Sequence, residues 1–218
     1  MRLHLSISGH NEKIPFNYQH MLTGAIHKWL GRNEDHGQLS LYSFSWLLGG
    51  KAVKDGLIVN GQTRFFISAH EGSLLKRIVE GIHKDNQVAQ NLFVEEVVIQ
   101  NEPEFKDEVL FFVSSPVFIK RVHDKREVHY TWKDKESDQF LTETLKHKLR
   151  KAGLSDEGVS VAFHREYHSP RTKVIYYKDI GNKVSLCPVI VQGTPEQLAF
   201  AWNVGVGNST GIGFGALN

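Results

Sequence analysis

The sequence predicts an α+β fold built from two similar units in tandem, and three observations predict it. The N-terminal half shows strand and helix periodicities in the order β-α-β-β-α-β, the order of a ferredoxin-like unit. The C-terminal half repeats short strands with an amphipathic helix, less regularly. A glycine-rich segment, residues 204–218, follows a strong helix start at the end of the chain. We therefore expect two tandem ferredoxin-like (RRM-like) domains, residues 1–108 and 109–218, with a C-terminal glycine-rich loop.

Each element of the first unit has its own signal in the sequence. Residues 2–8 alternate apolar and polar side chains, which is typical of a half-buried strand. Helical spacing follows Asn17, a candidate N-cap, and stops at Gly31. A polar loop follows that helix. The other predicted elements are strands over 40–47 and 64–69, paired as a hairpin, a helix over 73–84 and a strand over 92–99.

The second unit is less regular, and its elements are predicted one by one. Strands are predicted near 109–113, 117–122, 128–132, 159–163, 173–177 and 184–192, and a helix over 137–149 is closed by Gly153. Thr194 is predicted to cap a last helix, with Pro195 at its first position and Gln197 as the third residue of a capping box. No Pro/Gly-rich linker marks the boundary between the units, which we place from the order of elements.

The glycine-rich segment is the most informative stretch of the chain. Its last fifteen residues hold five glycines (205, 207, 211, 213 and 215), an Asn-Ser-Thr centre and no charged side chain. Glycine tolerates positive φ and lets another molecule approach the backbone closely. Successive exposed N–H groups in such a segment can cradle an anion, and phosphate is the anion that we expect. Interspersed apolar residues such as Ile212 and Phe214 argue against a disordered tail.

Composition restricts the class of partner. Residues 1–113 carry 11 Lys and Arg against 13 Asp and Glu, a net charge of −2, whereas residues 114–218 carry 15 against 11, a net charge of +4. A basic half that also holds the glycine-rich segment is compatible with a polyanionic partner. The single Cys187 excludes an internal disulfide and gives no metal-binding pattern. We expect no metal and no cofactor.

The sequence shows no signal peptide, and no apolar run approaches the roughly eighteen residues of a spanning helix. We therefore expect a cytoplasmic protein without membrane contact.

Three motifs in this order resemble a known family. They are Pro15-Phe16-Asn17-Tyr18 before the helical residues 22–26, then Leu41-Tyr42-Ser43-Phe44-Ser45-Trp46-Leu47, and finally Ser114-Ser115-Pro116-Val117 together with the C-terminal glycines. Together they are similar to the CRISPR repeat-processing endoribonucleases, the Cas6 family of the RAMP superfamily. The resemblance spans nearly the whole chain. It implies two tandem ferredoxin-like domains and metal-independent cleavage of CRISPR precursor RNA, in which a ribose 2′-OH attacks the scissile phosphate and leaves a cyclic phosphate.

Such a reaction needs a base, an acid and positive charge near the phosphate, and histidine suits the first two roles because its ordinary pKa is about 6.5. The chain has 12 histidines. The resemblance places a catalytic histidine in the loop at His36 and a second catalytic side chain at His27. Lys51, after the Gly49-Gly50 turn, is our candidate for stabilising the transition-state charge. An ordinary solvent-exposed histidine, a helix-face histidine and a solvated lysine are the alternatives.

Basic and aromatic residues of the second unit are the candidates for holding RNA, because cations neutralise phosphates and rings stack on exposed bases. With the polar and glycine positions of the C-terminal segment, the predicted RNA-binding residues are Lys120, Arg121, Lys125, Arg126, Arg165, Arg171, Lys173, Gly207, Asn208, Ser209, Gly211 and Gly213. A solvated hairpin face is the alternative for the basic residues. His164 and His168 are four residues apart, as in helical metal sites, but the flanking residues predict a strand.

The expected partner is CRISPR repeat RNA, and other CRISPR effector subunits or a second copy of the chain stay open as partners. Two other functions also stay open. One is a non-catalytic RNA-binding CRISPR subunit or degenerate paralogue, for which His36 is incidental. The other is a two-domain ferredoxin-like protein that binds small ligands or proteins.

Overall fold

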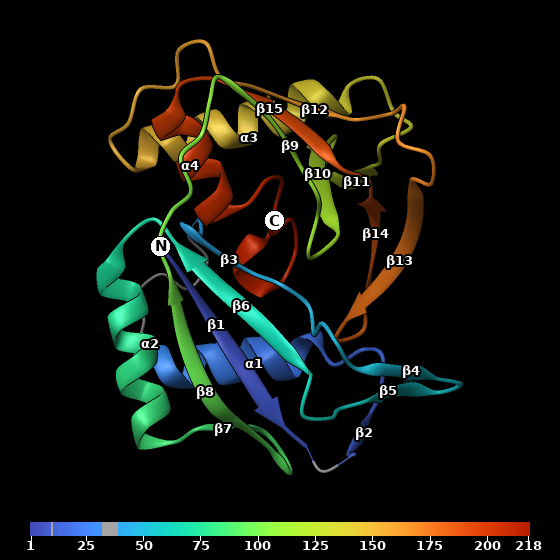
Figure 1. Ribbon diagram of the computed structural model, residues 1–218. Helices are drawn as coiled ribbons and strands as arrows, with labels where there is room; N and C mark the ends of the chain where they lie inside the picture. The colour runs from blue at the N-terminus through green and yellow to red at the C-terminus, as the bar shows by residue number, and fades with distance from the viewer. Residues whose placement is uncertain (10, 32–38) are drawn as a thin grey trace.

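The computed structural model describes residues 1–9, 11–31 and 39–218 (Figure 1). Its first half contains a five-stranded antiparallel sheet in the order β3-β6-β1-β8-β7. The elements are β1 (Arg2–Ser8), α1 (Gln19–Leu30), β3 (Tyr42–Phe44), β6 (Arg64–Ala69), α2 (Gly72–Lys84), β7 (Gln87–Ala89) and β8 (Leu92–Gln100). Without β7, the order β8-β1-β6-β3 is that of a ferredoxin-like sheet, so the predicted β-α-β-β-α-β unit is confirmed.

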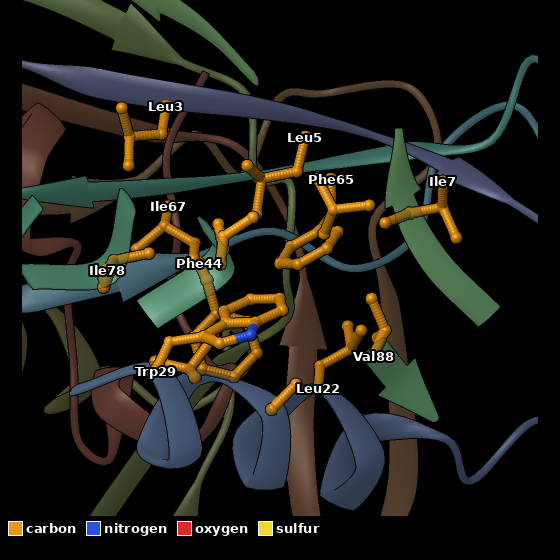
Figure 2. Packing of buried hydrophobic residues seen from close by; sticks show 14 of the residues in the cluster. Leu3, Leu5, Ile7, Leu22, Trp29, Phe44, Phe65, Ile67, Ile78 and Val88 are labelled. Atoms are coloured by element: carbon orange, nitrogen blue, oxygen red, sulfur yellow. The ribbon is translucent and has the colours of Figure 1, made fainter. Parts of the chain in front are cut away.

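The core of this unit follows from the alternation in β1. Leu3, Leu5 and Ile7 point from the strand toward Leu22 and Trp29 of α1 (Figure 2), and all of these side chains are buried. On the opposite face of β1, Arg2 contacts the C-terminal half of the chain, whereas His4, Ser6 and Ser8 are partly exposed. A small extra sheet, β2-β5-β4, was missed in the sequence because its strands β2 (Lys13–Ile14), β4 (Lys51–Val53) and β5 (Gly56–Ile58) have two or three residues each.

The second half contains two sheets. The three-stranded sheet β12-β15-β9 packs against both long helices of this half, and the four-stranded sheet β11-β10-β14-β13 consists of two hairpins. The elements are β9 (Glu108–Phe111), β10 (Val117–His123), β11 (Arg126–Tyr130), α3 (Ser137–Lys151), β12 (Ser160–Phe163), β13 (Arg171–Tyr177), β14 (Ile180–Leu186), β15 (Val189–Gln192), α4 (Pro195–Val204) and a 3₁₀ turn, η1 (Thr210–Ile212).

The chain end completes the second unit. Val113, just after β9, forms an isolated antiparallel bridge with Leu217, where a ferredoxin-like sheet has its fourth strand. The fold is therefore two ferredoxin-like units in tandem, as predicted from the sequence. The predicted division between residues 108 and 109 falls one residue inside β9, which begins at Glu108, and it stays a prediction.

Two predicted elements differ in detail. The strand expected over 184–192 is two strands in different sheets, since Pro188 has no N–H to continue a ladder. The first helix begins at Gln19 with Tyr18 as its N-cap residue, not at Asn17. By contrast, the capping box of α4 is present as predicted, with reciprocal hydrogen bonds between Thr194 and Gln197. Within the described residues, no helix is both long and apolar enough to cross a membrane.

Candidate functional site at the glycine-rich segment

The glycine-rich segment lies in the middle of the molecule, between the first sheet and the sheets of the second half (Figure 1). Most of it is buried. Asn208, Ser209 and Ile212 are half-buried, and Asn218 is exposed. The buried positions do not offer the predicted run of exposed N–H groups. Even at the half-buried Asn208-Ser209 corner, the Asn208 N–H donates to the Phe118 carbonyl oxygen over 2.7 Å.

The glycines allow a close approach by the chain itself. A Cβ on Gly211 would lie 2.3 Å from Ser40 Oγ, and a Cβ on Gly213 would lie 2.8 Å from Cε2 of the Phe44 ring. On the other side, a Cβ on Gly207 would lie 2.5 Å from the Phe118 carbonyl oxygen. Contact of Gly207, Gly211 and Gly213 with RNA stays a prediction. Packing against the first half is sufficient to explain Gly211 and Gly213, and packing within the second half is sufficient to explain Gly207.

Replacing Gly213 with alanine is expected to lower the free energy of unfolding by about 2 kcal/mol, because a new methyl group meets the Phe44 ring and the φ of +88° disfavours any L side chain. Urea unfolding measures the change. Gly24→Ala is the matched control, since nothing lies within 4 Å of its Cβ position in α1. The control is expected to be unchanged or slightly more stable, and an equal loss in both variants would contradict this account.

Three consecutive carbonyl groups of the segment accept side-chain hydrogen bonds from the first half. The Tyr42 hydroxyl donates to Gly211 O over 3.0 Å, and Trp46 Nε1 donates to Gly213 O over 3.0 Å. Between them, Gln19 Nε2 donates to Ile212 O. These three donors come from α1, β3 and the chain just after β3, so the first half fixes the position of η1.

His27 lies beside this contact. It is a half-buried residue near the end of α1, and its Nε2 is 3.5 Å from the Tyr42 hydroxyl oxygen. The structure thus brings a predicted catalytic histidine to the glycine-rich segment. Tyr42 was missed as a site residue. Its residue type gives no sign of a site, but its position within one of the motifs that carry the family resemblance could have indicated one.

The other two catalytic candidates are not brought to His27 by the described contacts. His36 lies outside the described residues. Lys51 is the exposed first residue of β4, where it pairs with Ile58 in the small extra sheet, and it makes no ion pair with a described residue. The roles of His36 and Lys51 stay predictions.

Two of the predicted RNA-binding cations adjoin the Asn208 corner. Asn208 Oδ1 accepts a hydrogen bond from the Lys120 backbone N–H over 2.9 Å and lies 3.4 Å from Arg121 Nη1. The Lys120 ammonium pairs with Glu127 over 2.8 Å. The Arg121 guanidinium packs over the ring of Phe140, with Cζ 4.6 Å from the ring centroid, and donates to the carbonyl oxygen of the same residue.

The remaining cations lie farther along the second half, with Lys125 and Arg126 at the β10–β11 turn, Arg171 and Lys173 on β13, and Arg165 in the chain before β13. Arg165 pairs with Asp138 and donates to the Trp132 carbonyl, so it joins its own loop to α3. RNA contact by these residues stays a prediction.

A groove of about 430 Å³ at the Asn208 corner holds residues that sequence reasoning missed. It is lined by Leu39, Arg121, Glu143, Thr144, His147, Arg150 and Asn208. His147 and Arg150 are exposed and stand three residues apart on α3, so they share one face of the helix. In the sequence this pattern is the same as that of an ordinary solvated helix face.

Lys148 holds the glycine-rich segment from the second half. It is 1% exposed, and its Nζ lies 3.1 Å from each of three acceptors, Val204 O, Gly205 O and Thr210 Oγ1. Burial lowers the pKa of this ammonium group to about 7. No carboxylate among the described residues forms an ion pair with it, so the carbonyl end of α4 supplies the compensating negative potential.

The lowered pKa predicts how stability changes with pH. Below about pH 7, Lys148 is charged in both states and its burial cost is fully present. Between about pH 7 and about 10.4, the unfolded chain binds the extra proton, so the free energy of unfolding rises with pH, by at most about 1.4 kcal/mol per pH unit. Urea unfolding at pH 6, 8 and 9.5 is expected to show this rise in the wild type relative to Lys148→Met. Parallel pH profiles for the two proteins would contradict it.

The family model described as CRISPR associated protein Cas6, C-terminal, matches residues 100–218. This match covers more than half of the chain. The chain belongs to the Cas6 family. The resemblance predicted from the sequence is thus confirmed, although a comparison with curated proteins finds no match.

Solved structures agree with Cas6 membership at the level of the fold. A protein described as CRISPR associated protein Cas6 is 21% identical, with a TM-score of 0.85, over 100% of this chain and 98% of its own. The product of a Cas6-related gene from Pyrococcus furiosus is 20% identical, with a TM-score of 0.85, over 100% and 97%. A RAMP protein binding different RNA substrates is 17% identical, with a TM-score of 0.82, over 100% and 98%. At these identities, the Cas6 and RAMP structures support the shared fold.

Proposed function

We propose that this Cas6-family protein is a metal-independent endoribonuclease that cleaves CRISPR precursor RNA within its repeats. The observation that carries the proposal is the position of His27, whose Nε2 lies 3.5 Å from the Tyr42 hydroxyl at the glycine-rich segment. An imidazole titrates close to neutral pH and can therefore move a proton in either direction during the reaction.

The reaction we propose uses the RNA's own nucleophile. A base removes the proton of the ribose 2′-OH, the oxygen attacks the adjacent phosphorus, and an acid protonates the departing 5′-oxygen. The products are a 2′,3′-cyclic phosphate and a 5′-hydroxyl. His27 is one partner of this acid–base pair, and His36 is the proposed second partner.

The contact with Tyr42 favours one state of His27. Because the Tyr42 hydroxyl donates its proton to Gly211 O, it presents an oxygen lone pair to other groups. A protonated Nε2 on His27 suits that lone pair, both in the neutral ring and in the imidazolium. Tyr42 therefore orients the imidazole and favours the tautomer that carries its proton on Nε2.

RNA is proposed to enter at the Asn208 corner, where Arg121, His147 and Arg150 line the groove. Six of the residues that line the groove belong to the basic half of the chain, and Leu39 belongs to the half that carries His27. Cations at a groove rim neutralise phosphates, so binding is expected to weaken as salt concentration rises.

Cleavage of a CRISPR repeat RNA by the purified protein in EDTA tests the proposal. We expect a single cut that is lost when the nucleotide before the scissile phosphate is 2′-deoxy, because that substitution removes the nucleophile. A product with a cyclic phosphate end supports the mechanism. Absence of cleavage in EDTA, or cleavage of the 2′-deoxy substrate, would overturn it.

A non-catalytic RNA-binding role is the second candidate, and one observation favours it. Of the two predicted catalytic residues that the structure describes, His27 lies at the glycine-rich segment, whereas Lys51 stands on a separate hairpin. The structurally similar RAMP protein is described as binding different RNA substrates. Salt-sensitive binding of repeat RNA without any cut product would establish this alternative.

A further inference from the structure

Lys148 is a buried charged residue that has no role in the proposed reaction itself. Its ammonium group has three N–H donors, and three acceptors surround it at 3.1 Å: Val204 O, Gly205 O and Thr210 Oγ1. The side chain reaches from α3 to the end of α4 and on to η1. A methionine of similar length would fill the same space but could hold none of these groups.

The three acceptors lie at the two ends of one short loop. Gly205 is the residue just after α4, and Thr210 is the first residue of η1. Between them the chain makes a tight turn in which Ser209 adopts a left-handed φ of +60°. One ammonium group therefore ties both ends of the loop that carries Asn208 and Ser209.

The same loop leads directly to His27. Thr210 is followed by Gly211, whose carbonyl oxygen accepts the Tyr42 hydroxyl over 3.0 Å. That hydroxyl oxygen is the atom 3.5 Å from His27 Nε2. Displacement of Thr210 would move the Gly211 carbonyl, which is the acceptor that orients the Tyr42 hydroxyl proton.

We propose that Lys148 is a positioning residue for the nuclease centre, holding Thr210 so that Gly211 O fixes the Tyr42 hydroxyl against His27. The proposal rests on the proposed function. Because Lys148 is only 1% exposed, we expect it to act through Thr210 and Tyr42 and not by direct contact with RNA. Its loss is therefore expected to change the rate of the chemical step and not the affinity for RNA.

A double-mutant cycle between Lys148→Met and Tyr42→Phe tests the coupling. Each single variant is expected to lower the single-turnover cleavage rate by about tenfold or more, because each removes one link to His27. In the Tyr42→Phe protein, adding Lys148→Met is expected to lower the rate by less than about threefold. Affinity for a repeat RNA made uncleavable by one 2′-deoxy nucleotide is expected to stay within about threefold of the wild type.

Two further variants complete the experiment. Thr210→Val keeps the shape of the side chain but removes the Oγ1 acceptor, and it serves if Lys148→Met does not fold; it is expected to slow cleavage and to be non-additive with Tyr42→Phe. Lys146→Met, two positions earlier on the same helix, is the matched control and is expected to cleave like the wild type.

The outcomes separate this proposal from the proposed function. A wild type that binds repeat RNA but does not cut it overturns both. A wild type that cuts while the Lys148 and Tyr42 effects multiply independently overturns the positioning role alone. Equal loss of RNA affinity and rate in Lys148→Met would also overturn it, because that pattern indicates general damage to the fold.

Discussion

Replacing His27 with alanine is expected to lower the single-turnover rate of repeat-RNA cleavage by about 10²–10⁴-fold, the usual contribution of one positioned proton transfer. The side chain sits near the end of α1 against Tyr42, and truncation to alanine leaves α1 a good helix. RNA affinity is expected to change little, since the imidazole is a small part of the binding surface. Quenched time points under excess enzyme, in EDTA, measure the rate.

His83→Ala is the matched control, because His83 is an exposed histidine near the end of the other helix of the same unit. It is expected to cleave at the wild-type rate. The His27→Ala/His36→Ala double variant tests the pair: if the two histidines act as one acid–base couple, the second substitution adds less than the first. Undiminished cleavage by the double variant would refute histidine catalysis.

The first half of the fold was predictable because its signals are local. Apolar and polar side chains alternate in residues 2–8, and apolar side chains recur at helical spacing before Gly31. Each pattern arises because one face of the strand or helix packs against the core. The small β2-β5-β4 sheet was not predictable in this way, since strands of two or three residues have no measurable period. The break at Pro188 was readable in principle, because a residue without N–H rarely continues a central strand.

The role of the glycine-rich segment could be predicted only in part. Five glycines correctly indicated that something approaches the backbone closely. They did not indicate whether the approaching group belongs to a ligand or to the chain, because both need the same absent Cβ. The contacts of Gly211 with Ser40 and of Gly213 with Phe44 link residues about 170 positions apart, and no local pattern encodes them.

The candidate site was predictable only where its residues have a local signal in the sequence. His27 could be placed on a helix and singled out by the family resemblance, and the structure brings it to the glycine-rich segment. Tyr42 was missed as a site residue because its contact with Gly211 crosses from one half of the chain to the other. Lys148 was missed because its three acceptors lie 56 to 62 positions farther along the chain. In sequence, the buried Lys148 is indistinguishable from the half-buried Lys146 and the exposed Lys151 of the same helix.

Arg2→Met is expected to lower the free energy of unfolding by about 3 kcal/mol, the largest effect on stability that we predict. The alternation in β1 predicts one polar face that is open to solvent, but Arg2 on that face is only 1% exposed. Its guanidinium lies between the rings of Phe66 and Trp202, with Cζ 3.7 Å from each ring centroid. It joins the first sheet to the end of the second unit.

The cost of Arg2→Met comes mainly from the groups left behind. Methionine retains much of the apolar contact with the two rings, but the carbonyl groups of Trp202 and Leu217 lose the donor Nη2 in a buried site. Arg64→Met, at an exposed position of the neighbouring strand β6, is the matched control and is expected to change stability by less than about 0.5 kcal/mol. Urea unfolding compares the two variants. Equal stability would mean that the contact between Arg2 and the chain end does not hold the two halves together.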